Sequence, residues 1–375
     1  MKKCRLGDVA TVYLSNVDKK SKENQKEVVL CNYVDVYKNW AITNKIAKDF
    51  MVSTASDSEI EKFTLRKGNV ALTKDSETRD DIGISTYIAD DINNMILGYH
   101  NALIIPNEKL LDGKYLNAYL HSQTAKRYFE LNASGSGQRY TLTIDSILDL
   151  IVYMPELDEQ RRIGNIFSSI DKKIENNNAI NNNLQELMNT FYDYYFIKQA
   201  QNNVSNCSKL LCKDILEVKT GKEDANFGNS NGKYKFFTCS KETINCDKPA
   251  FSGQSILIAG NGDFNVKHYN GEFNAYQRTY VLIPSDSLYY GTLYMSALKL
   301  VQKFKKASSG SIVKFISKSD VENIEIIIPN NHNLLLSLNK YLDYIEKNEK
   351  ENERLIKIRN FILPLLMNGQ AIIDE

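Results

Sequence analysis

Residues 163–195 read IGNIFSSIDKKIENNNAINNNLQELMNTFYDYY. Apolar residues, with two asparagines among them, recur at alternating steps of four and three, which predicts a long helix with one apolar seam. Residues 334–366 have the same spacing, and each seam position lies 171 residues after its counterpart. The predicted seams are Ile163, Phe167, Ile170, Ile174, Asn177, Asn181, Leu184, Met188, Phe191 and Tyr195, and then Leu334, Leu338, Tyr341, Ile345, Asn348, Asn352, Leu355, Arg359, Ile362 and Leu366.

Neither predicted helix would be stable alone, because each seam needs a partner. One interpretation packs each helix on its own globular domain. The other pairs the two helices with each other, and an antiparallel pair gives the chain pseudo-twofold symmetry. That pairing would place Asn177 near Asn352 and Asn181 near Asn348, where buried asparagines fix the register at a cost in stability.

The ends of the predicted helices are marked by proline and glycine. Pro155 and Pro329 each precede one helix. Pro364 is expected to kink or end the second helix, because proline lacks the backbone N–H that the helix needs. Gly369 is the predicted stop signal.

The segments before the two helices repeat as well. A small Ser/Gly loop and then an apolar run precede each proline, at residues 133–155 and again at residues 307–329. Branched residues predict strands at 28–30, 70–72, 102–105, 234–238, 255–259 and 280–283, with helices at 115–129 and 288–305. We therefore predict an α/β (α+β) fold with two similar domains, residues 1–155 and 199–329. Two long helices, residues 156–198 and 330–375, would follow them and form an antiparallel coiled coil.

Composition excludes several classes of protein. No apolar run approaches the roughly 20 residues that span a membrane, and no signal-peptide core opens the chain. The six cysteines are scattered without a CxxC pair, so we expect neither disulfides nor a metal site. A reducing cytoplasm is the expected location. Residues 1–155 carry 20 basic and 20 acidic side chains, whereas residues 201–329 carry 16 and 12, a net charge of +4.

Sequence motifs of catalysis are absent. The chain has no phosphate-binding GxxxxGK[ST] loop, and the segment at 260–265 lacks the third glycine of a dinucleotide site. The histidines, at 100, 121, 268 and 332, form no HExxH motif. We predict no catalytic residue and no metal ligand.

Polar loops remain as candidate binding sites, although any one of them could be an ordinary turn. Gln, Asn and Arg can bond base edges, and Lys suits phosphates. In the first domain we predict that Gln138 and Arg139 contact bases or phosphates and that Lys20 and Lys74 contact the DNA backbone. The candidates in the second domain are Lys222, Asn261 and Arg278.

Four short motifs taken together resemble those of the specificity subunit of type I restriction–modification systems. They are LGDVA at 6–10, ASGSGQ at 133–138, PELDEQRRI at 155–163 and LPLLMNGQ at 363–370. The second copy departs from this pattern, since residues 329–333 read PNNHN and the second Ser/Gly loop lacks the Gln-Arg pair.

The resemblance implies a function. Each domain would read one half of a split DNA target, and the helices would set the spacing between the halves. They would also dock two methyltransferase subunits, which use S-adenosylmethionine to methylate adenine, and restriction subunits using ATP and Mg would join. This subunit would bind double-stranded DNA, carry no cofactor and not associate with membranes. Two alternatives remain open: a stand-alone regulatory DNA-binding protein, and a coiled-coil scaffold that does not bind DNA.

Overall fold

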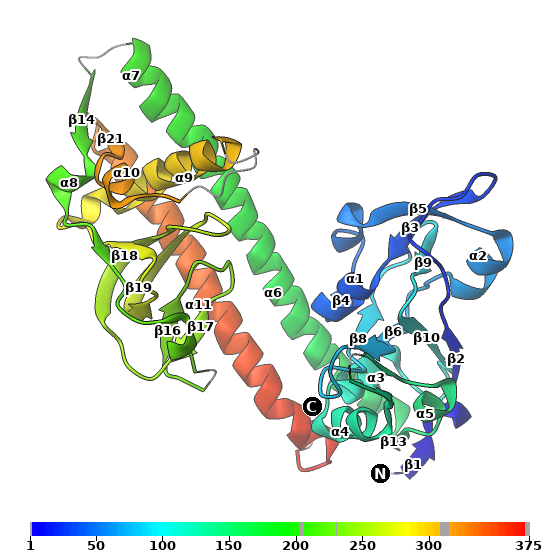
Figure 1. Cartoon of the computed structure of the whole chain (residues 1–375). Helices are drawn as coiled ribbons and strands as arrows, with labels where there is room; N and C mark the ends of the chain where they lie inside the picture. Colours follow the sequence, from blue (N-terminus) through cyan, green and yellow to red (C-terminus); the bar gives the residue numbers. More distant parts are fainter. Residues whose placement is uncertain (1, 138, 203–205, 230, 308–314, 372–375) are drawn as a thin grey trace. The chain divides into compact units, whose positions relative to one another are not determined.

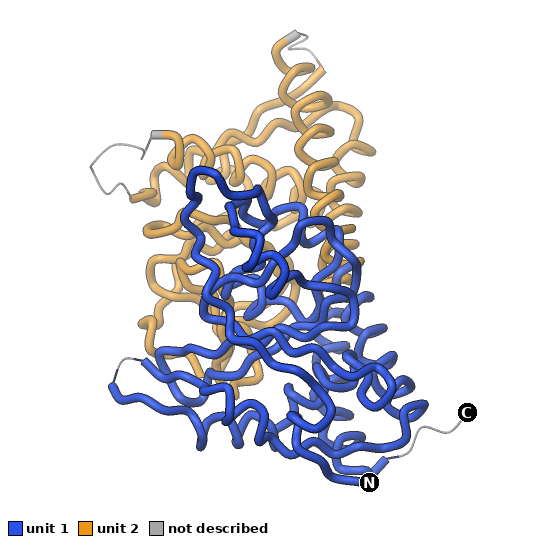
Figure 2. The backbone as a smooth tube through the Cα atoms, turned by 90° about the vertical axis from the view of Figure 1, so that its right-hand side faces the viewer, with its two compact units in different colours: residues 1–175, 352–375 blue, residues 176–351 orange. Residues whose placement is uncertain are grey.

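The computed structural model describes residues 2–137, 139–202, 206–229, 231–307 and 315–371. The chain divides into two compact units (Figure 2). Unit 1 comprises residues 1–175 and 352–375, and unit 2 comprises residues 176–351. Each unit therefore contains one globular domain and part of each long helix.

The main sheet of unit 1 has five strands in the order β2-β10-β6-β8-β4 (Figure 1). These strands are β2 (Ala10–Leu14), β10 (Asn101–Pro106), β6 (Val70–Thr73), β8 (Ser85–Ile88) and β4 (Ala41–Ile42). Every neighbouring pair is antiparallel except β4 and β8, which are parallel. Helix α3 (Gly113–Leu120) and helix α4 (Gln123–Asn132) follow β10 and contribute Tyr115, Tyr119 and Phe129 to the core.

Smaller sheets complete unit 1. Strand β1 (Lys2–Arg5) pairs with β13 (Ile151–Met154), and β3 (Lys26–Cys31) lies between β5 (Met51–Ala55) and β9 (Met95–Leu97). Strands β11 (Ser134–Ser136), β12 (Arg139–Thr141) and β7 (Asp75–Ser76) form a third. The short helices are α1 (Tyr33–Lys38), α2 (Asp57–Phe63) and α5 (Ile144–Leu148).

The main sheet of unit 2 has the order β15-β20-β18-β19-β16-β17. Its strands are β15 (Lys219–Thr220), β20 (Thr279–Leu282), β18 (Phe251–Ala259), β19 (Val266–Ala275), β16 (Tyr234–Phe237) and β17 (Ile244–Cys246). Strand β14 (Cys207–Leu211) pairs with β21 (Glu325–Pro329). The helices are α8 (Cys212–Ile215), α9 (Tyr290–Ala307) and α10 (Lys318–Glu322).

The two sheets have the same topology. Strands β2, β10, β6, β8 and β4 correspond in order to β15, β20, β18, β19 and β16, and the last pair is parallel in both units. The separate two-stranded sheets β1-β13 and β14-β21 also correspond. The predicted duplication is therefore confirmed at the level of strand order.

Two long helices pass from one unit into the other. Helix α6 (Leu157–Tyr192) continues through a π-helical segment (Asp193–Lys198) into α7 (Gln199–Asn202), and α11 runs over Asn333–Met367. In unit 1, early residues of α6, Ile163 and Phe167, share a core with late residues of α11, among them Leu366. In unit 2, late residues of α6 share a core with early residues of α11, such as Met188 with Leu338. The pairing is antiparallel, as predicted.

The predicted register is confirmed at one asparagine pair. The amide Nδ2 of Asn348 donates a hydrogen bond of 2.8 Å to Oδ1 of Asn181. Asn177 is buried and donates to Glu351 over 2.7 Å. Since Asn177 and Asn352 belong to different units, their proximity stays a prediction.

Two predicted boundaries need correction. Pro364 does not end α11, which continues to Met367, and the alternative of a kink at this residue stays a prediction. Proline only removes one donor near the end of the helix, and the actual stop is Gly369 at φ 67°, as predicted. Its N–H donates to the Leu366 carbonyl and that of Gln370 donates to Leu365, the paired bonds of a Schellman motif. The predicted helix at 115–129 is two helices, because Ser122 caps α4 by accepting from the Ala125 N–H.

Candidate nucleic-acid interface

Three loops meet at one end of the main sheet in each unit. In unit 1 the Lys74 N–H donates to the His100 carbonyl over 2.9 Å, and the Leu142 N–H donates to the Lys74 carbonyl over 2.8 Å. In unit 2 the N–H of Gly260 donates to the Arg278 carbonyl, and that of Ile316 donates to Gly260, both over 2.9 Å. Lys74, His100 and Leu142 therefore correspond to Gly260, Arg278 and Ile316.

This correspondence identifies the same place in both domains. In unit 1 the loop after β6 meets the loop before β10, and in unit 2 the loop after β18 meets the loop before β20. In both units the segment after the small Ser/Gly loop bonds to the first of these two loops. Adjacent to these bonds, Asp75 corresponds to Asn261, and Tyr99 corresponds to Gln277. The backbone scaffold is shared, whereas the side chains that it presents differ.

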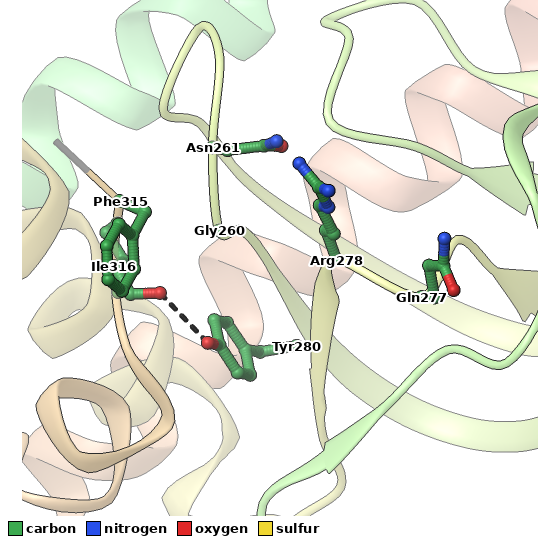
Figure 3. Close-up of a pocket in the computed structure, with 7 residues that line it drawn as sticks. All are labelled: Gly260, Asn261, Gln277, Arg278, Tyr280, Phe315 and Ile316. Carbon is green, nitrogen blue, oxygen red and sulfur yellow. Dashed lines mark hydrogen bonds between the residues drawn. The ribbon is translucent and has the colours of Figure 1, made fainter. Parts of the chain in front are cut away.

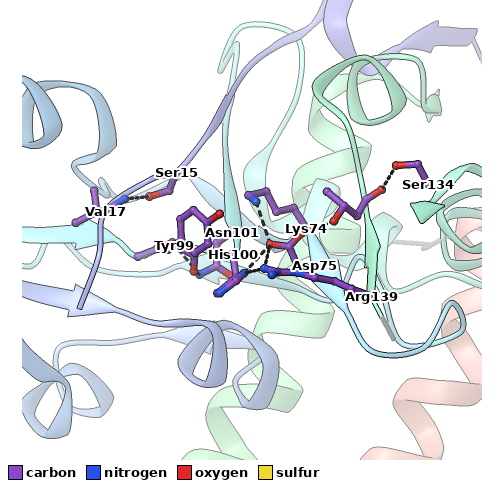
Figure 4. A network of polar contacts seen from close by, with 11 residues as sticks. Ser15, Val17, Lys74, Asp75, Tyr99, His100, Asn101, Ser134 and Arg139 are labelled. Carbon is purple, nitrogen blue, oxygen red and sulfur yellow. Dashed lines mark hydrogen bonds and ion pairs between the residues drawn. The ribbon is translucent and has the colours of Figure 1, made fainter. Parts of the chain in front are cut away.

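In unit 1 these loops form a polar network around Asp75 (Figure 4). The buried carboxylate lies 3.0 Å from the Lys74 ammonium and 2.6 Å from Nδ1 of His100. It also accepts a 2.6 Å hydrogen bond from the hydroxyl of Thr141. Burial alone would raise the pKa of Asp75, but the hydrogen bonds from Thr141, His100 and Lys74 outweigh it and lower that pKa to about 2. The carboxylate is therefore charged at neutral pH and holds the loops together.

Arg139 covers this network from the solvent side. Its Nη2 lies 2.8 Å from Nδ1 of His100 and 3.5 Å from the carboxylate of Asp75, while 58% of its side chain remains exposed. A cavity of about 640 Å³ opens beside it, lined also by the stacked rings of Tyr33 and Tyr37. The guanidinium thus has one side fixed by protein and another open to a ligand.

Lys74 and Lys20 differ in accessibility. The ammonium of Lys74 is buried between Asp75 and the ring of Tyr99, whose centre is 4.9 Å away. A phosphate contact by Lys74 would require this arrangement to open. Lys20 is exposed and follows residues 17–19, which line a second cavity of about 500 Å³ with Tyr99 and His100. Gln138, the remaining candidate in this domain, lies outside the described residues.

In unit 2 the equivalent loops form a pocket of about 440 Å³ (Figure 3). Two of the predicted residues, Asn261 and Arg278, line it together. The hydroxyl of Tyr280 donates to the Ile316 carbonyl over 2.9 Å and closes one wall. Lys222 is exposed and does not line the pocket, but its neighbour Glu223 accepts a backbone hydrogen bond from Gln277.

Several lining residues were not among the sequence candidates. Asp75 and His100 are missing from the candidates in unit 1, because the histidines were tested only for an HExxH motif and the binding candidates are Gln, Asn, Arg and Lys. Tyr280 and Phe315 are missing from the candidates in unit 2 because those candidates are polar loop residues of the types Gln, Asn, Arg and Lys. No single sequence offset relates these positions, since Lys74, His100 and Leu142 lie 186, 178 and 174 residues before their counterparts in unit 2.

The predicted seam residues all lie on the two long helices, and their side chains are buried or half-buried. This holds for Ile163, Phe167, Ile170, Ile174, Asn177, Asn181 and Leu184 on α6 and for Leu338, Ile345, Asn348, Asn352 and Leu355 on α11.

Among the described residues, no group of three or more His, Cys, Asp or Glu side chains is arranged to hold a metal ion. Among the helices formed by those same residues, none combines the length and the apolar character needed to cross a membrane.

Comparison with known proteins connects this geometry with a family. The family model described as the type I restriction modification DNA specificity domain matches residues 1–186 and 207–358. The specificity subunit of the type I restriction enzyme EcoDI of Escherichia coli is 33% identical over 164 residues. That segment covers 42% of this chain and 37% of the relative, so this match spans little more than a third of the relative's length.

Two further proteins match along most of their length. The specificity subunit of the type I restriction enzyme HindI of Haemophilus influenzae is 22% identical, with 82% of this chain and 88% of that protein covered. The crystal structure of a type I restriction–modification S subunit from M. genitalium has a TM-score of 0.61 at 16% identity. It covers 100% of this chain and 96% of the other, so the two share a fold.

Proposed function

The chain belongs to the family of type I restriction modification DNA specificity domains, and we propose that it recognises a bipartite DNA target, with one half read by each unit. Proteins of this family recognise DNA and do not themselves catalyse a reaction. The observation that carries the proposal is the duplicated three-loop group, in which one backbone scaffold presents two different sets of side chains. Two recognition sites that present different side chains suit a DNA target whose two halves differ in sequence.

The named site residues take distinct roles in this proposal. Arg139 and Arg278 are exposed guanidinium groups at equivalent ends of the two sheets, and Asn261 adds an amide beside Arg278. These groups suit base edges or phosphates. Lys20 and Lys222 are exposed and suit phosphates. Gln138, next to Arg139 in the sequence, and the buried Lys74 are the other proposed contacts.

The proposed partners are two methyltransferase subunits, with restriction subunits joining the same complex. S-adenosylmethionine and ATP with Mg²⁺ would be bound by those partners, which would methylate adenine and cleave DNA. A pair of identical partners needs a repeated docking surface. The long helices carry one: Leu187 on α6 and Ile358 on α11 are 171 residues apart and are 46% and 50% exposed.

Domain replacement tests the bipartite reading. Residues 1–155 are exchanged for the corresponding domain of another specificity subunit, and the modified sequence is determined by methylome sequencing of the host. We expect one half of the target to change and the other to persist. If both halves changed together, the two units would not be separate readers.

Reconstitution tests the dependence on partners. A duplex carrying the target is titrated against the chain alone and against the chain with its methyltransferase partners, at one salt concentration. The net charge of +1 leaves little sequence-independent attraction to phosphate, so we expect tighter binding in the complex. Equal affinities would favour a stand-alone DNA-binding protein, and absence of binding in both titrations would favour a scaffold.

A further inference from the structure

The pair of side chains at the loop junction differs sharply between the two units. In unit 1 the pair is Asp75 and His100, whose polar atoms bond each other at 2.6 Å. In unit 2 the pair is Asn261 and Arg278, and among the described residues neither side chain has a hydrogen-bond or ion-pair partner. Figure 3 shows the amide and the guanidinium pointing toward each other across the pocket.

The backbone beneath the unit 2 pair is fixed. The residue after Asn261 in the pocket loop is Gly262 at φ 70°, and Gly260 before it donates to the Arg278 carbonyl over 2.9 Å. Thr279 pairs with Ala259 in the β18-β20 ladder directly beside these loops. Backbone hydrogen bonds at the ends of β18 and β20 therefore hold the segments that carry both side chains, which lowers the entropy that a ligand contact must overcome.

The pocket combines polar and apolar groups in a way that fits the edge of a base pair. Arg278 offers a planar fork of donors, and Asn261 offers one donor group and one acceptor. Phe315, which is 69% exposed, and Tyr280 line the same pocket and give it an apolar wall. A phosphate would satisfy the guanidinium but would leave the amide acceptor and the aromatic wall unused.

We propose that Arg278, positioned beside Asn261, reads a guanine in the half-site bound by unit 2. In the major groove guanine presents O6 and N7, which an arginine fork can bond together. The amide of Asn261 is then available to contact the neighbouring base. The inference rests on the proposed function, since it assigns one base of the target to one residue.

The test uses the full chain in complex with its methyltransferase partners and a library of random duplexes. Binding preferences are determined for the native chain, for Arg278→Lys and for Arg278→Gln. Lysine keeps the positive charge but lacks the fork, so it separates base reading from phosphate attraction. We expect both variants to lose about 10- to 100-fold discrimination for guanine at one position of one half-site, with the other half-site unchanged.

A second measurement changes the DNA and compares the native complex with the Arg278→Lys complex. In the native complex, 7-deazaguanine at the assigned position removes N7 and should weaken binding about as much as Arg278→Lys does, whereas it should add little to the loss in Arg278→Lys. Unchanged base preference in both variants, with uniformly weaker binding, would overturn the assignment and leave Arg278 as a phosphate contact. A native complex with no sequence preference anywhere would instead overturn the proposed function itself.

Discussion

The side chain of Asn348 on α11 donates a 2.8 Å hydrogen bond to that of Asn181 on α6, within a seam that is otherwise mostly apolar. A half-buried amide of this kind is satisfied only when its partner lies at the matching height on the other helix. A shift of either helix would leave both amides without that bond. The pair therefore fixes the antiparallel register in unit 2.

Replacing one member of this pair should cost more than replacing both. We expect Asn348→Leu to lower the free energy of unfolding by about 1–3 kcal/mol, because Asn181 then lacks its partner. The double variant Asn181→Leu/Asn348→Leu should recover most of that loss through apolar packing. Denaturation of the four proteins of the double-mutant cycle measures the coupling, and additive effects would show that the hydrogen bond does not matter. Asn183→Leu, at an exposed position of α6, is the control.

The carboxyl of Asp171 should make the stability of the folded protein depend on pH. Burial raises the pKa of this carboxyl to about 7, although Arg359 opposes the shift and Glu175 adds to it. Because the folded pKa lies above the unfolded value of 3.8, the contribution of this carboxyl to stability is complete below about pH 3.8 and is lost as pH rises through about 7. Asp171→Asn should therefore stabilise the protein at pH 8, by about 2 kcal/mol, and have little effect near pH 4. Melting temperatures of the two proteins between pH 4 and pH 8 test this, and a constant difference would contradict it.

Asp75 predicts the opposite dependence on pH. Its pKa is lowered to about 2, so its stabilising contribution is complete above the ordinary value of 3.8 and is lost as pH falls toward 2. Asp75→Asn should destabilise unit 1 by about 1–3 kcal/mol at pH 7, since the charged bonds to Lys74 and His100 are lost. The deficit should shrink below about pH 4. Asp57→Asn, whose carboxylate is 79% exposed in its pair with Lys26, should show neither effect.

Removal of the Lys20 side chain should change the salt dependence of DNA binding. Lys20→Ala should weaken binding to every sequence alike and should reduce the slope of log K against log salt by about 0.9, the value for one phosphate contact. Lys109→Ala is a matched control, because this exposed lysine follows the opposite end of β10 from His100. Affinities measured at several salt concentrations give the slope for each protein. Equal slopes for Lys20→Ala and the native protein would remove Lys20 from the interface.

We predict that Leu187 and Ile358 belong to a repeated docking surface for the methyltransferase partners. Both are about half exposed, so glutamate at either position should leave the fold intact. Each single substitution should weaken the binding of one partner and spare the other, and the two together should weaken both. Partner stoichiometry by native mass spectrometry measures this, with Asn183→Glu as the control on an exposed face. Full occupancy in the double variant would exclude this surface.

The loops illustrate why residue roles are harder to predict than architecture. Lys74 and Lys20 are both lysines in polar loops, and nothing local distinguishes them. Only the folded chain shows that Asp75 and Tyr99 enclose Lys74, while Lys20 is exposed. Tyr99 reaches Lys74 from the loop before β10, and His100 of the same loop lies 25 residues from the aspartate that it contacts. Local sequence carries no signal for such long-range contacts.

The sequence by itself determined the duplication and the two long helices, and it offered their antiparallel pairing as one of two arrangements. These features follow from periodic spacing and from a constant offset between copies, which are properties of the chain read along its length. Gly369 as the helix stop belongs with them, because a left-handed residue after a helix is a local requirement. Tertiary structure alone decided that three separate loops meet at one end of each sheet, with a bonded Asp75–His100 pair in one unit and an open Asn261–Arg278 pair in the other. The physical reason is that strand pairing brings together residues far apart in sequence, and the resulting burial and hydrogen bonding determine which polar side chains remain free to bind a ligand.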